Sequence, residues 1–374
     1  MIFTKDGRVM IDKSFVSKNF DLIKEKVYNN VRLSKDDALY LFKSDDLLSI
    51  GGLADFKNFQ VNGNKAYYIV NIHINYTNIC VNRCAFCAFY RKGKEIDAYT
   101  MNVEEIIEYI KADYPTNNFR EVHIVGGLHP SLPYYFYVNM IRRIKKEFPA
   151  LLIQAFTAVE IDYLSEISGL SVGEVLLDLK ENGLDSLPGG GAEIFNFAIR
   201  KRLCPQKISG DRWIQIHKTA HGLGIPSNAS MLYGVKESYE DRVNHLSDIR
   251  LAQDESAGFK SFIPFAFQPK NTAVKNSGLT SGYDDLKVIA VSRLFLDNFK
   301  HVKTFFVNLG INLAQVSLSF GADDFDGTLV NEKISHDAGS VNPARLSVKN
   351  VKRIIEETGK IPTERDTLYN IVFN

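Results

Sequence analysis

Residues 68–91 read YIVNIHINYTNICVNRCAFCAFYR and combine a strand pattern with a run of cysteines. In the first ten residues, Asn71, His73 and Asn75 alternate with the apolar Ile72 and Ile74. A parallel strand covered by helices on both faces reads as a nearly continuous apolar run, whereas this strand has a polar face. The alternation therefore predicts a strand over 68–77 whose polar face lines a barrel interior wide enough to hold a ligand.

Cys80, Cys84 and Cys87 follow this strand directly, and the whole chain has 4 cysteines. Four thiolates would close a zinc or iron–sulfur site, whereas three on one short loop leave a metal position open. A redox dithiol of Cys84 and Cys87 would leave Cys80 unexplained. A structural zinc would need a fourth ligand, which no nearby CxxC or paired histidine supplies. The remaining cysteine, Cys204, is expected to be structural.

Short strand-like runs alternate with amphipathic stretches along most of the chain. We expect strands at 68–77, 121–125, 151–157, 183–188, 226–233, 261–267, 304–308 and 315–320. Helices are expected at 103–114, 134–148, 210–224, 237–255 and 283–300. This order favours an α/β fold, a (β/α)8 TIM-type barrel, with a doubly wound open sheet as the alternative. In the barrel, the cysteine loop lies at the carboxyl ends of the strands, where such folds build their active sites.

Two extensions flank the predicted barrel. Residues 1–65 are expected to form an N-terminal helical extension, because Ser34 and Asp37 have capping-box form and Ala38 and Leu41 follow at helical spacing. Gly51 and Gly52 are expected to break that helical segment. The barrel is assigned to 66–325. Residues 326–374 are assigned to a C-terminal extension packed on the barrel, with a helix near 348–360.

Charge and hydropathy exclude several classes of function. The chain has 374 residues, with 45 Lys and Arg against 44 Asp and Glu. This near-neutral balance gives no indication of a nucleic-acid-binding groove or of a surface that binds anionic membranes. Its first residues lack the apolar stretch of a secretory signal, and no run of apolar residues is long enough to span a bilayer. A cytoplasmic location is therefore expected, where clustered cysteines are more often metal ligands or catalytic groups than disulfides.

The spacing C-x3-C-x2-C, with Phe86 just before the last cysteine, resembles the signature of the radical S-adenosylmethionine superfamily. The resemblance implies a 4Fe–4S cluster held by Cys80, Cys84 and Cys87, with S-adenosylmethionine as co-substrate on the free iron. It also implies an electron donor such as flavodoxin or ferredoxin. The residues expected to bind S-adenosylmethionine are Phe86, Gly126, Gly127 and Glu193.

Gly126 and Gly127 belong to GGLHP (126–130), which resembles the turn that holds the methionine amino group, although Leu128 stands where a glutamate is frequent. Glu193 belongs to PGGGAEI (188–194), expected to be a glycine turn followed by a helix with Glu193 in its first turn. We expect Glu193 to contact the ribose hydroxyls. The alternative is a tight turn in which Glu193 only complements the helix dipole.

Longer motifs narrow the resemblance to the aminofutalosine synthase family of menaquinone biosynthesis, chiefly CPQKISGDRW (204–213) and FIPFAFQPKNT (262–272). That family implies a small aromatic enol ether substrate, 3-[(1-carboxyvinyl)oxy]benzoate, to which the 5′-deoxyadenosyl group is added. Val235 stands where a histidine is expected. The candidate substrate residues are His73, Asn75, His123, Asn228 and Gln268, with Arg200 and Arg202 as carboxylate clamps.

Three alternatives remain at this point. Two share the cysteine loop and PGGGAEI: the radical cyclase that acts later in the same pathway, dehypoxanthine futalosine cyclase, and a deazaflavin synthase. The third is a zinc-stabilised binding protein without turnover.

Overall fold

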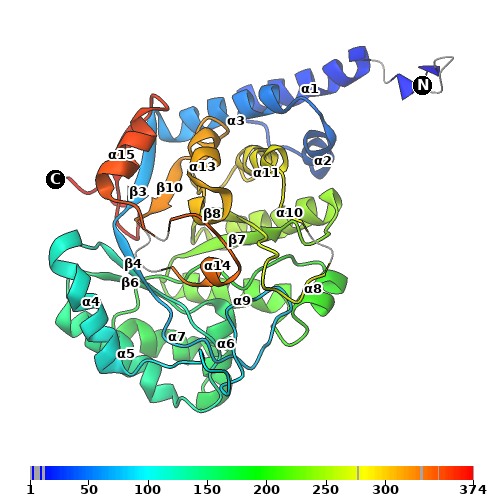
Figure 1. Ribbon diagram of the computed structural model, residues 1–374. Helices are drawn as coiled ribbons and strands as arrows, with labels where there is room; N and C mark the ends of the chain where they lie inside the picture. Colours follow the sequence, from blue (N-terminus) through cyan, green and yellow to red (C-terminus); the bar gives the residue numbers. More distant parts are fainter. Residues whose placement is uncertain are drawn as a thin grey trace.

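The computed structural model describes residues 2–3, 9–10, 13–275, 278–328, 332–343 and 345–373. Residues 4–8, 11–12, 329–331 and 344, which belong to the two expected extensions, lie outside the described residues. In Figure 1 the N-terminal helices lie along one side of the molecule, next to α11 and α13. None of the described helices combines the length and the apolar character needed to cross a membrane. The division into 1–65, 66–325 and 326–374 stays a prediction.

The N-terminal part contains the short antiparallel strands β1 (Ile2–Phe3) and β2 (Val9–Met10), followed by α1 (Lys13–Tyr28), α2 (Lys35–Lys43) and α3 (Leu47–Asn62). The expected capping box is present, since Ser34 caps α2 and Asp37 bonds back to the Ser34 backbone. The expected break at Gly51 and Gly52 is wrong, because α3 runs through both. A Cβ at Gly51 would lie 2.3 Å from the Phe320 ring, so the glycine permits close packing rather than a turn.

The strand expected at 68–77 is two consecutive strands, β3 (Lys65–Ile69) and β4 (Asn71–Ile74). β4 pairs in parallel with β5 (Glu121–Ile124), and β5 pairs with β6 (Leu152–Ala155). β7 (Ser227–Tyr233), β8 (Phe259–Ala266) and β9 (His301–Val302) form a second parallel set. β10 (Asp324–Gly327) lies parallel to β3.

Isolated parallel bridges join these sets into a ring. Gln154 bridges to Ser186, Leu187 to Ser227, and Lys303 to Asp324. β3 and β4 follow one another and together form one strand of the ring, between β10 and β5. The expected fourth strand, near 186–187, closes the gap between β6 and β7. The architecture is the expected (β/α)8 TIM-type barrel.

Helices cover the barrel, and many of them begin at a side-chain cap. Asn102, Thr157, Ser171 and Ser238 each accept a hydrogen bond from a backbone N–H of the first turn and form complete capping boxes. The helices are α4 (Val103–Asn117), α5 (Tyr134–Glu147), α6 (Ala158–Ser168), α7 (Val172–Glu181), α8 (Phe197–Leu203), α9 (Gly210–Gly222), α10 (Tyr239–Ser256), α11 (Gly282–Phe295), α12 (Phe306–Leu309), α13 (Ile311–Ser317), α14 (Ile334–Asp337) and α15 (Val348–Glu356).

The last two expected strands are wrong. Residues 304–308 overlap α12 and residues 315–320 overlap α13, whereas the strands of this region are β9 and β10. β10 has the sequence DFDG, whose two carboxylates do not read as a buried strand. It is stable there because cations from elsewhere in the chain pair with both carboxylates.

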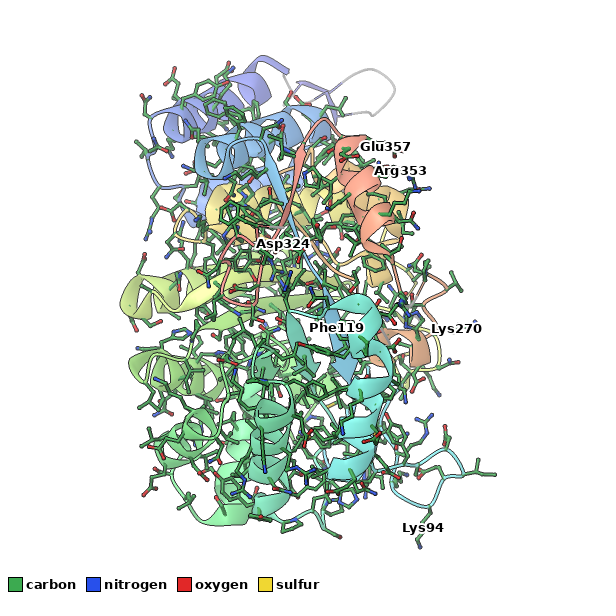
Figure 2. The ribbon with its side chains drawn as sticks, turned by 90° about the vertical axis from the view of Figure 1, so that its left-hand side faces the viewer. Lys94, Phe119, Lys270, Asp324, Arg353 and Glu357 are labelled. Atoms are coloured by element: carbon green, nitrogen blue, oxygen red, sulfur yellow. The ribbon has the colours of Figure 1, made fainter. Side chains whose placement is uncertain are left out.

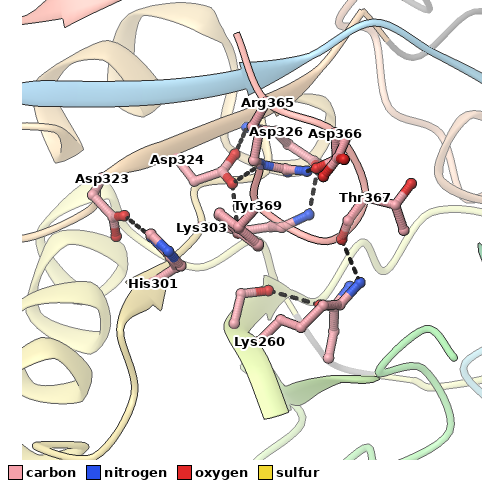
Figure 3. Close-up of polar contacts among 12 residues, drawn as sticks. Lys260, His301, Lys303, Asp323, Asp324, Asp326, Arg365, Asp366, Thr367 and Tyr369 are labelled. Carbon is pink, nitrogen blue, oxygen red and sulfur yellow. Dashed lines mark hydrogen bonds and ion pairs between the residues drawn. The ribbon is translucent and has the colours of Figure 1, made fainter. Parts of the chain in front are cut away.

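The C-terminal segment closes the amino-terminal end of the barrel. β11 (Ile361–Glu364) pairs in parallel with β3, on the edge opposite β10. Beyond it, Arg365 donates to Asp324 at 2.6 Å and the Tyr369 hydroxyl donates to the same carboxylate at 2.6 Å (Figure 3). Lys303 donates to Asp326 at 2.9 Å. In contrast, Figure 2 shows Arg353 and Glu357 on the outer side of α15.

Candidate active site

The three clustered cysteines line a single cavity of about 340 Å³ inside the barrel. Their loop leaves the carboxyl end of β4 and is held by backbone hydrogen bonds, from Cys80 N to Arg91 O at 3.0 Å and from Ala85 N to Leu203 O at 2.7 Å. Cys204 is buried next to this loop and is not among the residues that line the cavity. The barrel thus presents three thiols, not four, to one space.

The chemistry of these thiols fits an iron–sulfur cluster. Burial raises the pKa of the Cys84 thiol to about 12, so a thiolate there needs adjacent positive charge. Among the described residues, no group of three His, Cys, Asp or Glu side chains is arranged to hold a metal ion. A single zinc needs ligands that converge on one point, whereas a cubane cluster binds each thiolate at a different iron. Three thiols that line one cavity without converging on a single point suit the larger group.

The Gly126–Gly127 turn follows β5 and packs directly on the start of the cysteine loop. Both glycines line the cavity, and a Cβ at Gly127 would lie 2.2 Å from the carbonyl oxygen of Ile79. The Gly126 N–H donates to Glu160 Oε1 at 3.1 Å, and the Tyr76 hydroxyl donates to the same oxygen at 3.0 Å. Any side chain at Gly127 would therefore push the turn away from the cysteines.

Glu160 is a residue of this site that the sequence analysis missed. It is buried, burial raises the pKa of its carboxyl group, and it lines the cavity at the start of α6. Its other oxygen accepts hydrogen bonds from the backbone and hydroxyl of Thr157. The sequence carries a signal for it, the capping-box pair Thr157 and Glu160, although that pattern indicates only a helix start.

The structure corrects the local setting of Glu193. The expected helix begins only at Phe197, so Glu193 lies in an extended loop and not in a first helical turn. Its φ of 51° is left-handed, and its carboxylate pairs with Lys207 at 2.5 Å. Lys207 also lies 5.0 Å from the centroid of the Phe86 ring, and all three side chains line the cavity. Lys207 was not predicted, although it belongs to the quoted run CPQKISGDRW.

Four of the predicted substrate residues line the same cavity. The rings of His73 and His123 stack with centroids 4.6 Å apart and planes 10° from parallel. Burial lowers the pKa of each to about 4, so both are neutral at pH 7. Asn228 donates to Gln154 Oε1 at 3.0 Å, and Gln268 donates to the carbonyl of Asn308 at 3.2 Å. The structure therefore brings together His73, His123, Asn228 and Gln268.

Asn75, Arg200 and Arg202 are not among the residues that line this cavity. Arg200 is buried, and its guanidinium donates to the backbone carbonyls of Ala192 and Ile208. Arg202 donates to the carbonyl of Val235 at 2.8 Å. Asn75 donates to the carbonyl of Val125 at 3.0 Å. Backbone oxygens thus engage these donors, and the structure does not support Arg200 and Arg202 as carboxylate clamps.

The floor of the cavity carries charged groups that the sequence analysis did not select: Lys303, Glu121, Asp326 and Glu332. Burial alone would raise the pKa of Glu121, but the nearby His123, Lys303 and Arg365 together outweigh it, and the pKa falls to about 2. Lys303 was missed because it follows β9, one of the strands that were placed wrongly. It is the cation of the floor, paired with Asp326.

Family comparisons agree with this geometry. The radical SAM superfamily model matches residues 74–249, and a model of the CofH/MqnC C-terminal region matches residues 256–373. The chain is 44% identical to aminodeoxyfutalosine synthase of Thermus thermophilus, over 94% of this chain and 95% of that protein.

A second relative is named for a different activity. The chain is 39% identical to 5-amino-6-(D-ribitylamino)uracil–L-tyrosine 4-hydroxyphenyl transferase of Methanothermobacter thermautotrophicus, over 90% of this chain and 94% of that protein. Among solved structures, methylornithine synthase has a TM-score of 0.71 at 21% identity and covers 91% of this chain and 97% of its own. That likeness shows the fold. The chain is an enzyme and belongs to the radical SAM superfamily, whose members use a 4Fe–4S cluster and S-adenosylmethionine.

Proposed function

We propose that this enzyme is an aminofutalosine synthase. It adds the 5′-deoxyadenosyl group of S-adenosylmethionine to the vinyl carbon of 3-[(1-carboxyvinyl)oxy]benzoate. Aryl migration and loss of the carboxylate then give 6-amino-6-deoxyfutalosine and methionine. The observation that carries the proposal is the 44% identity to an aminodeoxyfutalosine synthase over 94% of the chain. A cavity of about 340 Å³ suits small-molecule ligands.

In this proposal the mouth of the cavity binds the cofactors. Cys80, Cys84 and Cys87 hold the cluster, and the Gly126–Gly127 turn lies against the methionine part of S-adenosylmethionine. When bound, the two cofactors supply the 5′-deoxyadenosyl group, with an electron from a donor such as flavodoxin or ferredoxin. Glu193, fixed by Lys207, accepts hydrogen bonds from ribose hydroxyls.

The aromatic substrate occupies the inner part of the cavity. Phe265 and Phe305 line it in a T-shaped arrangement, with centroids 5.3 Å apart, and offer faces for a benzoate ring. Lys303 provides the positive charge that a substrate carboxylate needs, and neutral His123 can donate one hydrogen bond. Apolar walls around these groups keep water from the reacting carbon.

One observation favours a second candidate. Glu121, Asp326 and Glu332 also line the inner cavity, and carboxylates accept hydrogen bonds from amino and hydroxyl groups better than they tolerate a dianionic substrate. The 4-hydroxyphenyl transferase at 39% identity is named for an amino- and ribityl-bearing uracil and tyrosine. An activity of that class is the alternative that the floor of the cavity supports.

The test is an anaerobic incubation of the reconstituted enzyme with S-adenosylmethionine, dithionite and the enolpyruvyl benzoate. Mass spectrometry should find an adenine-containing adduct that requires the benzoate. A parallel incubation replaces the benzoate with the ribitylaminouracil and tyrosine. Free 5′-deoxyadenosine as the sole nucleoside product with the benzoate, together with a coupled product in the parallel incubation, would overturn the proposal in favour of the second candidate.

A further inference from the structure

Gln154 connects Lys260 to His123. Its side chain lies in β6 and is 2% exposed. The carboxamide oxygen accepts three hydrogen bonds, from Asn228 Nδ2 at 3.0 Å, Lys260 Nζ at 3.1 Å and Ser186 Oγ at 3.3 Å. The carboxamide nitrogen lies 2.9 Å from His123 Nδ1. The partners come from several neighbouring strands, so the barrel itself sets this arrangement.

Lys260 decides which way the carboxamide faces. Burial lowers the pKa of Lys260 to about 7, so below that pH the side chain is an ammonium group. An ammonium group has three donors and no acceptor, so the amide atom that it contacts must then be the oxygen. The same ammonium donates to the carbonyl of Thr367 at 2.7 Å in the C-terminal segment (Figure 3). Lys260 is therefore held from both sides, and it fixes the nitrogen of Gln154 toward His123.

The orientation of Gln154 determines the protonation of His123. An amide nitrogen only donates, so His123 Nδ1 must offer its lone pair, and the proton of the neutral ring resides on Nε2. Glu121 Oε1 lies 3.9 Å from Nδ1 and would favour a proton there, but it is a full ångström farther than the Gln154 nitrogen. The other charged or titratable groups around the ring are Lys303, Lys260 and the stacked His73.

We propose that Gln154, locked by Lys260, is a positioning residue that keeps His123 as the neutral Nε2–H tautomer and so presents one hydrogen-bond donor to the cavity. Gln154 does not pass a proton, because an amide cannot exchange one along this path without becoming an imidic acid. In the proposed function this donor fits a carboxylate oxygen of the substrate. Only that last statement rests on the proposed function, since the tautomer follows from contacts within the chain.

The test is nitrogen NMR of the oxidised holoenzyme carrying 15N-labelled histidine. The chain has 8 histidines, and His123→Gln identifies the resonances of His123 by their loss. At pH 6, above the pKa of His123 and below that of Lys260, wild-type His123 should show an unprotonated Nδ1 and a protonated Nε2. Gln154→Glu preserves size but replaces the donor with an acceptor, so Nδ1 should gain a proton. Lys260→Met removes the obligatory donor, so a mixture of both tautomers should appear.

The matched control is Gln268→Glu. Gln268 lines the same cavity but bonds backbone carbonyls, so this change adds the same charge without touching His123. The His123 tautomer should stay as in the wild type. A wild-type spectrum with the proton on Nδ1 would overturn the proposal, and so would a folded Gln154→Glu variant with an unchanged tautomer. If Gln154→Glu does not fold, the wild-type and Lys260→Met spectra still decide. A wild-type enzyme that forms no futalosine adduct but shows the expected spectrum would count against the proposed function alone.

Discussion

The two ends of the barrel differ in whether their charged and reactive groups have partners within the chain. At the amino-terminal end, Asp324 is fully buried and accepts hydrogen bonds from Arg365 and Tyr369, all within the chain. At the carboxyl end, Cys80, Cys84 and Cys87 line a cavity beside a glycine turn. One end thus completes its interactions internally, whereas the other presents ligating groups to an open space. Barrel enzymes in general separate stability from catalysis along this axis.

The contrast implies that substitutions at the two ends affect different properties of the enzyme. A change at the mouth should remove activity and leave the fold, and a change at the closed end should lower stability before it alters chemistry. The four predictions below test this separation.

The largest effect is expected for Cys84→Ala. The variant should lose cluster binding and reduce product formation to background, because two thiolates on this loop cannot hold the cluster. Circular dichroism and the melting temperature should show a folded barrel, since the loop is peripheral to the strands. Measured iron and acid-labile sulfide should fall together. Cys204→Ala, beside the loop but outside the cavity lining, is the control and should retain iron and sulfide. Global unfolding of Cys84→Ala would show that the mouth is structural after all.

At the closed end, Arg365→Met should lower the free energy of unfolding by about 3–5 kcal/mol, because it leaves the buried Asp324 carboxylate without its cation. Urea denaturation measures this. Arg353→Met is the matched control, since Arg353 pairs with Glu357 on the exposed side of α15 and its loss should leave stability nearly unchanged. Equal effects of the two variants would break the distinction between buried and surface pairs.

A smaller effect is expected for Glu160→Gln, which replaces a carboxylate that accepts bonds from Gly126, Tyr76 and Thr157. An amide nitrogen facing these donors should cost about 1–3 kcal/mol in unfolding free energy. It should also raise the KM for S-adenosylmethionine more than it lowers kcat, because the glycine turn shifts. Glu174→Gln alters the equivalent capping box of α7, whose residues do not line the cavity, and should leave that KM unchanged.

The smallest effect concerns pH and the segment 332–343, which contributes Glu332, Ile334, Ser335 and Ala338 to the cavity lining. A hydrogen bond from His336 to Glu332 at 3.1 Å raises the pKa of His336 from 6.5 to about 9. Because the folded-state pKa is raised, this stabilisation is complete below pH 6.5 and is lost as the pH rises through about 9. It should amount to about 1 kcal/mol or less for such a partly exposed pair. Limited proteolysis of the segment should become faster as the pH rises from 6.5 to about 9 and should level off above it.

His336→Gln supplies the control for this pH effect. The variant should show the faster proteolysis at neutral pH and little further change as the pH rises. A wild-type profile that is flat from pH 6.5 to 9 would contradict the assignment of the pair.

Local patterns predicted the mouth of the barrel well. The cysteine run and the Gly126–Gly127 turn are each a short local motif that directly follows a strand, so their placement follows from strand order. The closed end was not predictable in the same way. The DFDG run of β10 reads as a solvated loop, and its burial depends on Arg365 and Lys303, which lie elsewhere in the chain.

The substrate residues show the same limit. Alternation along β4 and β5 placed His73 and His123 correctly in the cavity. Arg200 has the right chemistry for a carboxylate, but the backbone carbonyls that engage its guanidinium come together only once α8 and the loops on both sides of it are folded. Glu160 was missed because a capping box accounts for it equally well in the sequence. Lys207 was missed because it lies in the loop between α8 and α9, where a lysine forms no pattern of its own.

Pairing of β3 with β11 has a consequence for synthesis of the protein. The hydroxyl of Tyr68 donates to Glu364 at 3.3 Å across 296 residues of sequence. During translation, this edge of β3 has no such neighbour until the strand Ile361–Glu364 has left the ribosome. Asp324 must likewise wait for Arg365. The nascent chain therefore carries an unpaired β3 edge through most of its synthesis, and the Asp324 carboxylate lacks its cation for the 41 residues before Arg365 is made. Such a state invites chaperone binding and makes late ribosomal release the step at which the barrel is completed.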